Sequence, residues 1–323
     1  MKLNDNSRTD KFPEVISRLY NILFERLQEM KDENALSLLE LSNLTPKMVK
    51  GADYLYFQGR LLNGRQKQVY LGARKASVLD IEEKFAKAQE VKQKYLDTIE
   101  KSLGALRALG VGAFPARPGR VIAALAEAGI FDLYGGVLLE DAAFYCLAQL
   151  HGLMLPKALD DETDIVVGVS ASPKVPQNPL GLLDKGYSPV NRFDPVAMPY
   201  YSREVTGSCG ISFLCLWNEA GENGALLQFL IKEPIQVIAF CKRPVIVTVP
   251  DPVRYFLFKI IRSQLAENSS SIANRDLFQA KALFKGVREK LTYSEIYREA
   301  RALNWEWGPL IARGLENLKR TMG

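Results

Sequence analysis

Two carboxylates with a spacing suited to metal binding, Glu162 and Asp164, open the segment ETDIVVGVS. Residues two apart on a strand point to the same side, so both side chains can converge on one divalent cation. Hard cations such as Mg²⁺ and Mn²⁺ prefer carboxylate oxygens. Acidic pairs are also common in solvated turns before strands. The pair alone therefore does not decide between a metal site and a turn of that kind.

The rest of the composition narrows the chemistry. The 323 residues include one histidine, His151, which excludes chemistry that needs two histidines and makes a structural zinc site unexpected. The four cysteines contain no C-x-x-C pair and are interpreted as reduced core thiols. The net charge of +5 permits a phosphate-rich partner without requiring one. Neither a long apolar run nor an apolar N-terminal segment occurs, which predicts a cytoplasmic protein without a membrane partner.

The N-terminal part, residues 1–110, is predicted to consist of helices and one β-hairpin. Apolar residues recur at three- and four-residue spacing in its first third, which indicates a helix. Further on, alternating residues flank an Asn63-Gly64 pair, which is the strongest short-range signal for a hairpin. The elements expected here are a helix over Phe12–Lys47, hairpin strands over Tyr54–Arg60 and Gln66–Leu71, and a lysine-rich helix over Ser77–Leu109.

A glycine and proline cluster at residues 110–119 separates this part from a central α/β part, residues 111–250. From Pro252 onward the pattern is helical, which defines a C-terminal helical part, residues 251–323. This combination predicts an α+β fold. The strands expected in the central part are Gly136–Leu139, Asp164–Ser170, Ile211–Trp217, Gln236–Phe240 and Val245–Val249, and its clearest helix is Ala142–Leu150.

Four segments of the chain occur in an order typical of one known family: AGIFDLYGGVLLEDAAFYCLAQLHG, ETDIVV, VIVTVPDPVRYFLFKIIRSQ and NRDLFQAKALF. Together they resemble the bacterial nucleotidyltransferase-fold family, whose members belong to the minimal nucleotidyltransferase superfamily. The preceding segment YLYFQGRLLNGRQKQVYLG is similar to the aromatic, basic hairpin common in front of this domain. The resemblance covers roughly residues 50–290. It implies a nucleotidyltransferase-like mixed sheet with flanking helices, in which the first three strands of the central part are neighbours.

The resemblance also implies a reaction, the transfer of a nucleoside monophosphate from a nucleoside triphosphate to an acceptor. Mg²⁺ or Mn²⁺ would be the cofactor of that reaction. Glu162 and Asp164 match the positions of two metal ligands in the family, and Ser212 stands where a third acid is expected. The nature of the acceptor is left open.

Basic residues of two later helices face the triphosphate in the family. The residues that match them are Arg254, Lys259 and Arg275. Each also has a structural interpretation, because Arg254 could cover apolar surface with its stem and Arg275 could pair with a nearby acid such as Asp276. The resemblance makes a nucleoside triphosphate the expected partner of this region.

Departures from the family pattern weaken the implied activity. At the family's Gly-Ser or Gly-Thr turn, which lets backbone N–H groups approach the phosphates, this chain has Glu140-Asp141. A carboxylate about 5 Å from a phosphate costs about 3 kcal/mol per pair of unit charges at an effective dielectric constant of about 20. Ser212 offers no carboxylate, and Phe258 replaces the family's usual histidine. Gly135-Gly136 is an alternative phosphate turn if the register is shifted.

The sequence thus predicts a nucleotidyltransferase-fold protein that is weakly active or inactive. The alternative is a non-catalytic regulatory or binding module on the same scaffold, with the basic hairpin as a nucleic-acid-binding surface. A second interpretation of the hairpin is a ribbon packed by its aromatic residues, with basic residues turned outward for solubility. The basic residues are Arg60, Arg65, Lys67, Arg74 and Lys75, interleaved with Tyr54, Tyr56, Phe57 and Tyr70.

Overall fold

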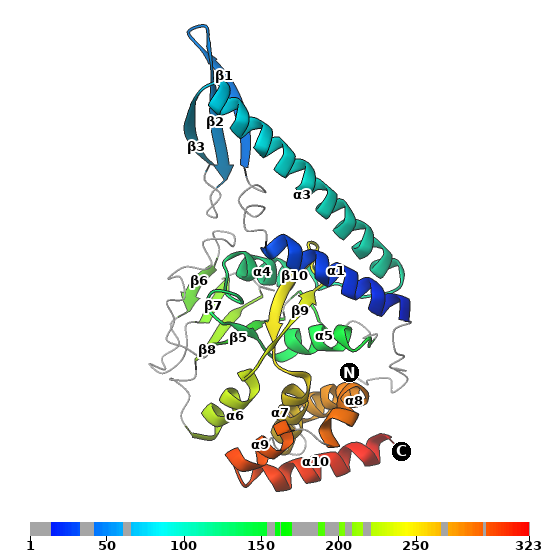
Figure 1. The fold of residues 1–323 in the computed structure, drawn as a ribbon. Helices are drawn as coiled ribbons and strands as arrows, with labels where there is room; N and C mark the ends of the chain where they lie inside the picture. Colours follow the sequence, from blue (N-terminus) through cyan, green and yellow to red (C-terminus); the bar gives the residue numbers. More distant parts are fainter. Residues whose placement is uncertain are drawn as a thin grey trace.

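The computed structural model describes residues 14–32, 42–60, 66–153, 159–161, 163–169, 187–190, 200–203, 209–215, 221–265, 271–292 and 295–322. Over these residues the protein has nine helices, a three-stranded sheet, a two-stranded sheet and a five-stranded sheet (Figure 1). The α+β class predicted from the sequence is therefore confirmed. No helix within the described ranges is long and apolar enough to cross a membrane.

The three-stranded sheet stands apart from the rest of the protein, at the far end of helix α3 (Ala76–Ala108) (Figure 1). Its antiparallel strands are β1 (Ser42–Val49), β2 (Ala52–Arg60) and β3 (Gln66–Ala73), in that order. We call this sheet the arm sheet. The predicted pairing of Tyr54–Arg60 with the strand that begins at Gln66, in a sheet separate from the central one, is confirmed. The turn residues Asn63-Gly64 lie outside the described residues.

Strand β1 lies where the sequence pattern predicted the end of a helix. The predicted helix Phe12–Lys47 is realised as α1 (Glu14–Asp32), whereas residues 42–47 belong to β1. Polar and apolar residues alternate in SNLTPKMV, as in a strand, and Pro46 is tolerated because β1 is an edge strand. Lys50-Gly51, with φ of 51° and 77°, makes the tight turn into β2. The helix prediction is wrong for residues 42–47.

Helix α1 and the second half of α3 pack together against the central part of the protein. The Tyr20 hydroxyl of α1 accepts a hydrogen bond from the Ile238 N–H at 3.0 Å, which ties the helix to strand β9 (Ile235–Ala239). The helices are thereby anchored at the end of α3 that is remote from the arm sheet. The buried residues of this cluster are Ile16, Tyr20, Leu23, Ile99, Leu103, Leu106, Val111, Ile238 and Phe240.

The five-stranded sheet is mixed and has the order β4-β5-β8-β7-β6. Strand β4 (Val137–Leu138) runs antiparallel to β5 (Ile165–Val169), and β5 runs parallel to β8 (Ile211–Cys215). Strands β7 (Tyr200–Arg203) and β6 (Tyr187–Val190) complete the sheet. The prediction that the first three of these strands are neighbours is confirmed.

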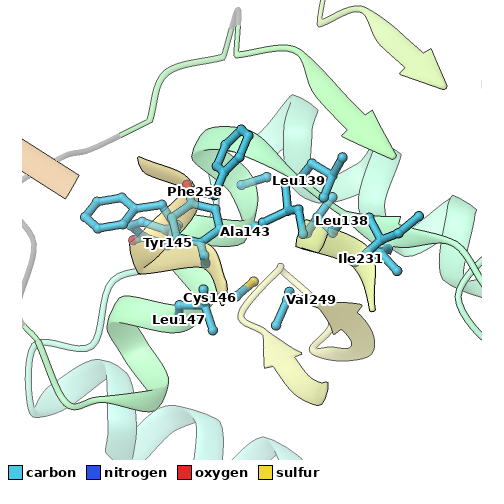
Figure 2. Packing of buried hydrophobic residues seen from close by; sticks show 14 of the residues in the cluster. Leu138, Leu139, Ala143, Tyr145, Cys146, Leu147, Ile231, Val249 and Phe258 are labelled. Atoms are coloured by element: carbon cyan, nitrogen blue, oxygen red, sulfur yellow. The ribbon is translucent and has the colours of Figure 1, made fainter. Parts of the chain in front are cut away.

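Helix α5 (Glu140–Leu150) follows β4 directly and is buried from Ala142 to Gln149. Figure 2 shows its side chains packed with those of β4, of strand β10 (Val245–Val249) and of helix α7 (Pro252–Leu265). One continuous buried cluster extends from Phe114 to Leu318 and so joins the central and C-terminal parts. The remaining helices are α4 (Ala116–Glu127), α6 (Gly221–Ile231), α8 (Ser271–Thr292), α9 (Glu295–Leu303) and α10 (Trp307–Met322).

Candidate functional site

The turn from β4 into α5 has an unusual backbone. Glu140 has a φ of 51°, in the left-handed region. That region costs about 1–2 kcal/mol for a residue with a Cβ, whereas glycine adopts it freely. The Leu139 N–H donates to the Val166 carbonyl oxygen at 2.8 Å, which places the turn beside the start of β5. The chain thus keeps a glycine-like backbone at the position where the family resemblance implies glycine, but glutamate occupies it.

The Glu140 carboxylate enters a group of four charged side chains contributed by α5, α7 and α8. Lys259 Nζ lies 2.9 Å from Glu140 Oε2 and 3.0 Å from Asp276 Oδ1. Arg262 Nη2 donates to the same two oxygens, at 2.9 Å and 2.6 Å. Lys259 and Asp276 are fully buried, while Glu140 and Arg262 are about a quarter exposed. We call these four residues the Glu140 cluster; its two positive and two negative charges balance.

The electrostatics of the Glu140 cluster favour the charged forms of Glu140 and Arg262. Burial alone raises the pKa of Glu140, but the Lys259 ammonium and the Arg262 guanidinium outweigh burial and hold that pKa at about 2. Burial lowers the pKa of Arg262, but its hydrogen bonds to Asp276 and Glu140 raise it to a higher net value. Lys259 Nζ and Arg262 Cζ also lie 5.5 Å and 4.9 Å from the centroid of the Phe258 ring. Phe258, at the position where the resemblance implies histidine, therefore lies near two cations.

The second carboxylate of the turn is also paired. Asp141 Oδ2 lies 3.1 Å from Arg275 Nη1, and its Oδ1 accepts a hydrogen bond from Gln279 Nε2 at 2.6 Å. The Tyr255 hydroxyl lies 2.9 Å from the Glu140 carbonyl oxygen and 3.0 Å from Gln279 Oε1, so its single proton serves both acceptors. Arg275 is 47% exposed, and its ion pair with Asp141 matches the structural interpretation of this arginine.

The predicted metal ligands are only partly brought together. Asp164 is exposed, and its Oδ1 accepts a hydrogen bond from the Gly210 N–H at 2.7 Å. Ser212 pairs with Val166 across β5 and β8, and the period of two puts Asp164, Val166 and Ser212 on one face of the sheet. The residue directly beside Ser212 on that face is therefore Val166, and Asp164 lies two positions earlier on the same strand. Glu162 lies outside the described residues. Within the described residues no group of three potential metal-ligating side chains occurs.

The alternative phosphate turn, Gly135-Gly136, lies at the opposite end of β4. Val137 pairs with Gly168, so the two glycines are beside the carboxyl end of β5, whereas Asp164 precedes its amino end. A Cβ on Gly136 would come within 2.8 Å of the Ile130 carbonyl oxygen, which explains the glycine by packing. The geometry does not bring these glycines to the predicted site.

Arg254 also lies away from the Glu140 cluster, although it shares helix α7 with Lys259. Five residues correspond to about 140° around a helix, so the two side chains leave different faces. Arg254 is 1% exposed, and its Nη2 lies 3.0 Å from both Glu233 Oε2 and Glu299 Oε2. Its guanidinium covers the Phe229 ring at 5.2 Å. These contacts hold α6, α7 and α9 together and leave Arg254 no part in a phosphate site with Lys259.

Two residues of the Glu140 cluster, Arg262 and Asp276, were not identified as site residues from the sequence. Arg262 follows Lys259 by three positions and Asp276 precedes Gln279 by three, so helical spacing puts each pair on one face. That spacing was available, but acids and bases at helical spacing are common on solvated surfaces. Only the approach of α5 to α7 and α8 shows that these residues share a site.

A comparison with known protein families finds a match for part of the chain. Residues 216–303 match a family model described as nucleotidyltransferase, which confirms the resemblance to that family over this stretch. No curated protein and no solved structure matches the chain. The matched residues include Lys259, Arg262 and Asp276, whereas Glu140, Asp164 and Ser212 precede them.

Proposed function

We propose that this chain is a nucleotidyltransferase-fold protein that transfers nucleotides weakly or not at all, because the Glu140 carboxylate takes the place of a nucleotide phosphate. The observation that supports this proposal most is the left-handed φ of Glu140 combined with its ion pairs to Lys259 and Arg262. With glycine at this position, two cations and a helix N-terminus would face an open space, and that is a favourable site for an anion.

A metal cofactor fits the described residues poorly. Mg²⁺ or Mn²⁺ bound with a nucleoside triphosphate would neutralise the phosphate charge and align an acceptor hydroxyl. Of the three residues on the relevant sheet face, Asp164 offers a carboxylate, Ser212 a neutral hydroxyl and Val166 nothing. Divalent cations of this type prefer several oxygen ligands, so we expect weak binding even with Glu162 as a second ligand.

The function that remains is that of a binding or regulatory module on the scaffold of a nucleotidyltransferase. The basic residues of the former phosphate site still have a role in such a module, because their ion pairs join α5, α7 and α8. We retain the division into an N-terminal part (1–110), a nucleotidyltransferase-like core (111–250) and a C-terminal helical part (251–323) as part of this proposal. The proposal does not name the acceptor of any residual nucleotide transfer.

The test is to restore the glycine turn and measure nucleotide binding. Calorimetry should detect binding of ATP or inorganic phosphate to the double variant Glu140→Gly, Asp141→Ser, and little binding to the unchanged protein. A matched control exists in Glu233→Gly, because Glu233 also has a left-handed φ, 49°, and pairs with the buried Arg254 as Glu140 pairs with the buried Lys259. The control should gain no phosphate binding. Equal binding by the unchanged protein and the double variant would contradict the proposal.

A transfer assay addresses the active alternative. The unchanged protein is incubated with Mg²⁺ or Mn²⁺, all four labelled ribonucleotides, and tRNA or protein acceptors. We expect little nucleotide transfer by the unchanged protein. The single variant Ser212→Asp should bind the metal more strongly without gaining transfer activity. Only Ser212→Asp combined with Glu140→Gly and Asp141→Ser should raise transfer, because catalysis needs metal and phosphate together. Labelling by the unchanged protein that Asp164→Asn abolishes would show an active enzyme instead.

A further inference from the structure

The net positive charge of the chain comes from residues 42–75, which include the arm sheet. Residues 42–75 contain seven basic residues and one acidic residue, Asp53, a net charge of +6. The whole chain has a net charge of +5, so all the other residues together carry −1. Such an asymmetry is typical of a surface that binds a polyanion. The basic residues are Lys47, Lys50, Arg60, Arg65, Lys67, Arg74 and Lys75.

Little of this charge is neutralised within the described residues. Arg74 forms a bidentate pair with Glu82 of α3, with distances of 2.9 Å and 2.8 Å. Lys47, Lys50 and Lys75 have exposed side chains. The side chains of the basic residues between positions 60 and 67 lie outside the described part of the chain, and these residues contribute to the net charge through the sequence alone. The arm sheet thus differs from the Glu140 cluster, where each cation has a carboxylate.

The two faces of the arm sheet have different surroundings. Leu55 is fully buried, and the next side chain on its face, Phe57, meets Phe85 of α3 with a ring-centroid distance of 6.4 Å. Residues on a strand alternate between faces, so Tyr54 and Tyr56 lie on the opposite face. Helix α3 therefore supports the sheet from one side and leaves the tyrosine side open. The packing role expected for the hairpin aromatics is met by Phe57.

Three tyrosine rings form a connected group on the open face. The Tyr70 ring lies 5.8 Å from the Tyr54 ring and 5.5 Å from the Tyr56 ring, centroid to centroid. Tyr70 is 56% exposed. Lys47 Nζ lies 5.2 Å above the Tyr56 ring and donates a hydrogen bond to Gln68 Oε1 at 3.1 Å. The open face therefore combines aromatic rings, a lysine and side-chain amides.

We propose that the open face of the arm sheet binds single-stranded nucleic acid, with bases stacked on Tyr54, Tyr56 and Tyr70 and a phosphate near Lys47. Every base has a face that can stack on a tyrosine, and basic side chains neutralise the backbone, so this combination suits a single strand. A duplex keeps its base faces covered and offers the rings nothing to stack on. The proposal is independent of the Glu140 cluster, because the helices that carry the cluster, α5, α7 and α8, lie away from the arm sheet (Figure 1).

The experiment measures fluorescence anisotropy of labelled 12-nucleotide oligouridylate and oligothymidylate, and of a duplex of the same length, with the full chain. We expect both single strands to bind more tightly than the duplex, with an affinity that falls as salt rises. Tyr70→Ala should weaken binding about tenfold, the effect of losing one stacking partner. Tyr70→Phe should retain binding, because stacking needs the ring and not the hydroxyl.

Controls separate stacking from general charge attraction and from misfolding. Trp305→Ala removes a 79% exposed aromatic residue of the C-terminal part and should leave binding unchanged. Lys47→Ala should reduce the salt dependence by about one phosphate contact. Circular dichroism and melting curves verify that each variant is folded. The double variant Tyr54→Phe, Tyr56→Phe keeps both rings and their packing, and it serves as a second control. The proposal is overturned by absence of single-strand binding at low salt, by preference for the duplex, or by equal affinity of Tyr70→Ala and the unchanged chain.

Discussion

The Glu140 cluster and the arm sheet both gather basic side chains, but they differ in what neutralises them. In the Glu140 cluster, Lys259 and Arg262 contact Glu140 and Asp276, and the four charges cancel. In the arm, residues 42–75 contain seven basic residues and one acidic residue. The comparison teaches that basic residues do not by themselves mark an anion site. A group of basic residues is a candidate site for an external anion only where the chain's own carboxylates do not pair with those residues.

The largest expected effect is on the stability of the Glu140 cluster. Asp276→Asn removes a fully buried carboxylate and leaves Lys259 and Arg262 with Glu140 alone. Breaking a buried ion pair from one side costs about 3–5 kcal/mol. Urea denaturation should show a loss of that size. Lys47→Ala in the arm sheet is the matched comparison, and a similar loss there would remove the distinction between the two regions.

The next effect is a dependence of stability on pH. The pKa of Glu140 is about 2 in the folded protein, below its ordinary 4.5, so its ionised form contributes stability above pH 4.5. That contribution is lost as the pH falls from about 4.5 to about 2, and it amounts to about 3 kcal/mol. Glu140→Gln should be less stable at neutral pH and less sensitive over this interval. Identical acid denaturation curves for the two proteins would contradict the role given to Glu140.

A smaller effect is expected for Glu140→Gly alone. The substitution relieves the left-handed backbone, worth about 1–2 kcal/mol, and this offsets part of the cost of losing the ion pairs. We expect a net loss of about 1–2 kcal/mol in the free energy of unfolding. Inorganic phosphate should raise the melting temperature of the variant and leave that of the unchanged protein constant. A phosphate effect of the same size on both proteins would show that Glu140 does not occupy the anion position.

The smallest effect is expected in the hairpin of the arm. Replacement of Arg65 and Lys67 by alanine should change the free energy of unfolding by no more than about 0.5 kcal/mol, if both charges are exposed as expected from the sequence. Nucleic-acid affinity should nevertheless fall, because two positive charges are removed. Differential scanning calorimetry and the anisotropy assay measure the two quantities. A clear drop in melting temperature would show that these residues are structural and would weaken the nucleic-acid proposal.

The sequence predicted those parts of the fold that depend on local pattern. Strands β4, β5 and β8, helix α5 and the pairing of β2 with β3 follow from alternation, helical spacing and the order of the family segments. Strand β1 was missed because the apolar residues before it continue a helical spacing, and its Lys50-Gly51 turn is less distinctive than an Asn-Gly pair. The α+β class was therefore accessible, although the number of strands in the arm sheet was not.

The candidate site was harder to predict from the sequence, because it forms only where helix α5 meets helices α7 and α8. The sequence marked Glu140-Asp141 as a departure from a phosphate turn, but the partners of the two carboxylates lie about 120 to 140 positions further along the chain. The separation of Arg254 from Lys259 follows from helix geometry and could have been deduced from their spacing. The left-handed φ of Glu140 has no signature in the sequence, since glutamate rarely adopts it.

Helix α3 separates the arm sheet from the core of the protein (Figure 1). Its 33 residues extend for about 50 Å at 1.5 Å per residue. Near the arm sheet, ion pairs four residues apart stabilise the helix, Asp80 with Lys84 and Glu83 with Lys87, both at 2.7 Å. A mononucleotide is much shorter than this helix, so it cannot contact the arm sheet and the core end of α3 at the same time. A polymer long enough to span tens of ångströms can, so the length of this helix selects the size of any ligand that joins the two ends of the molecule.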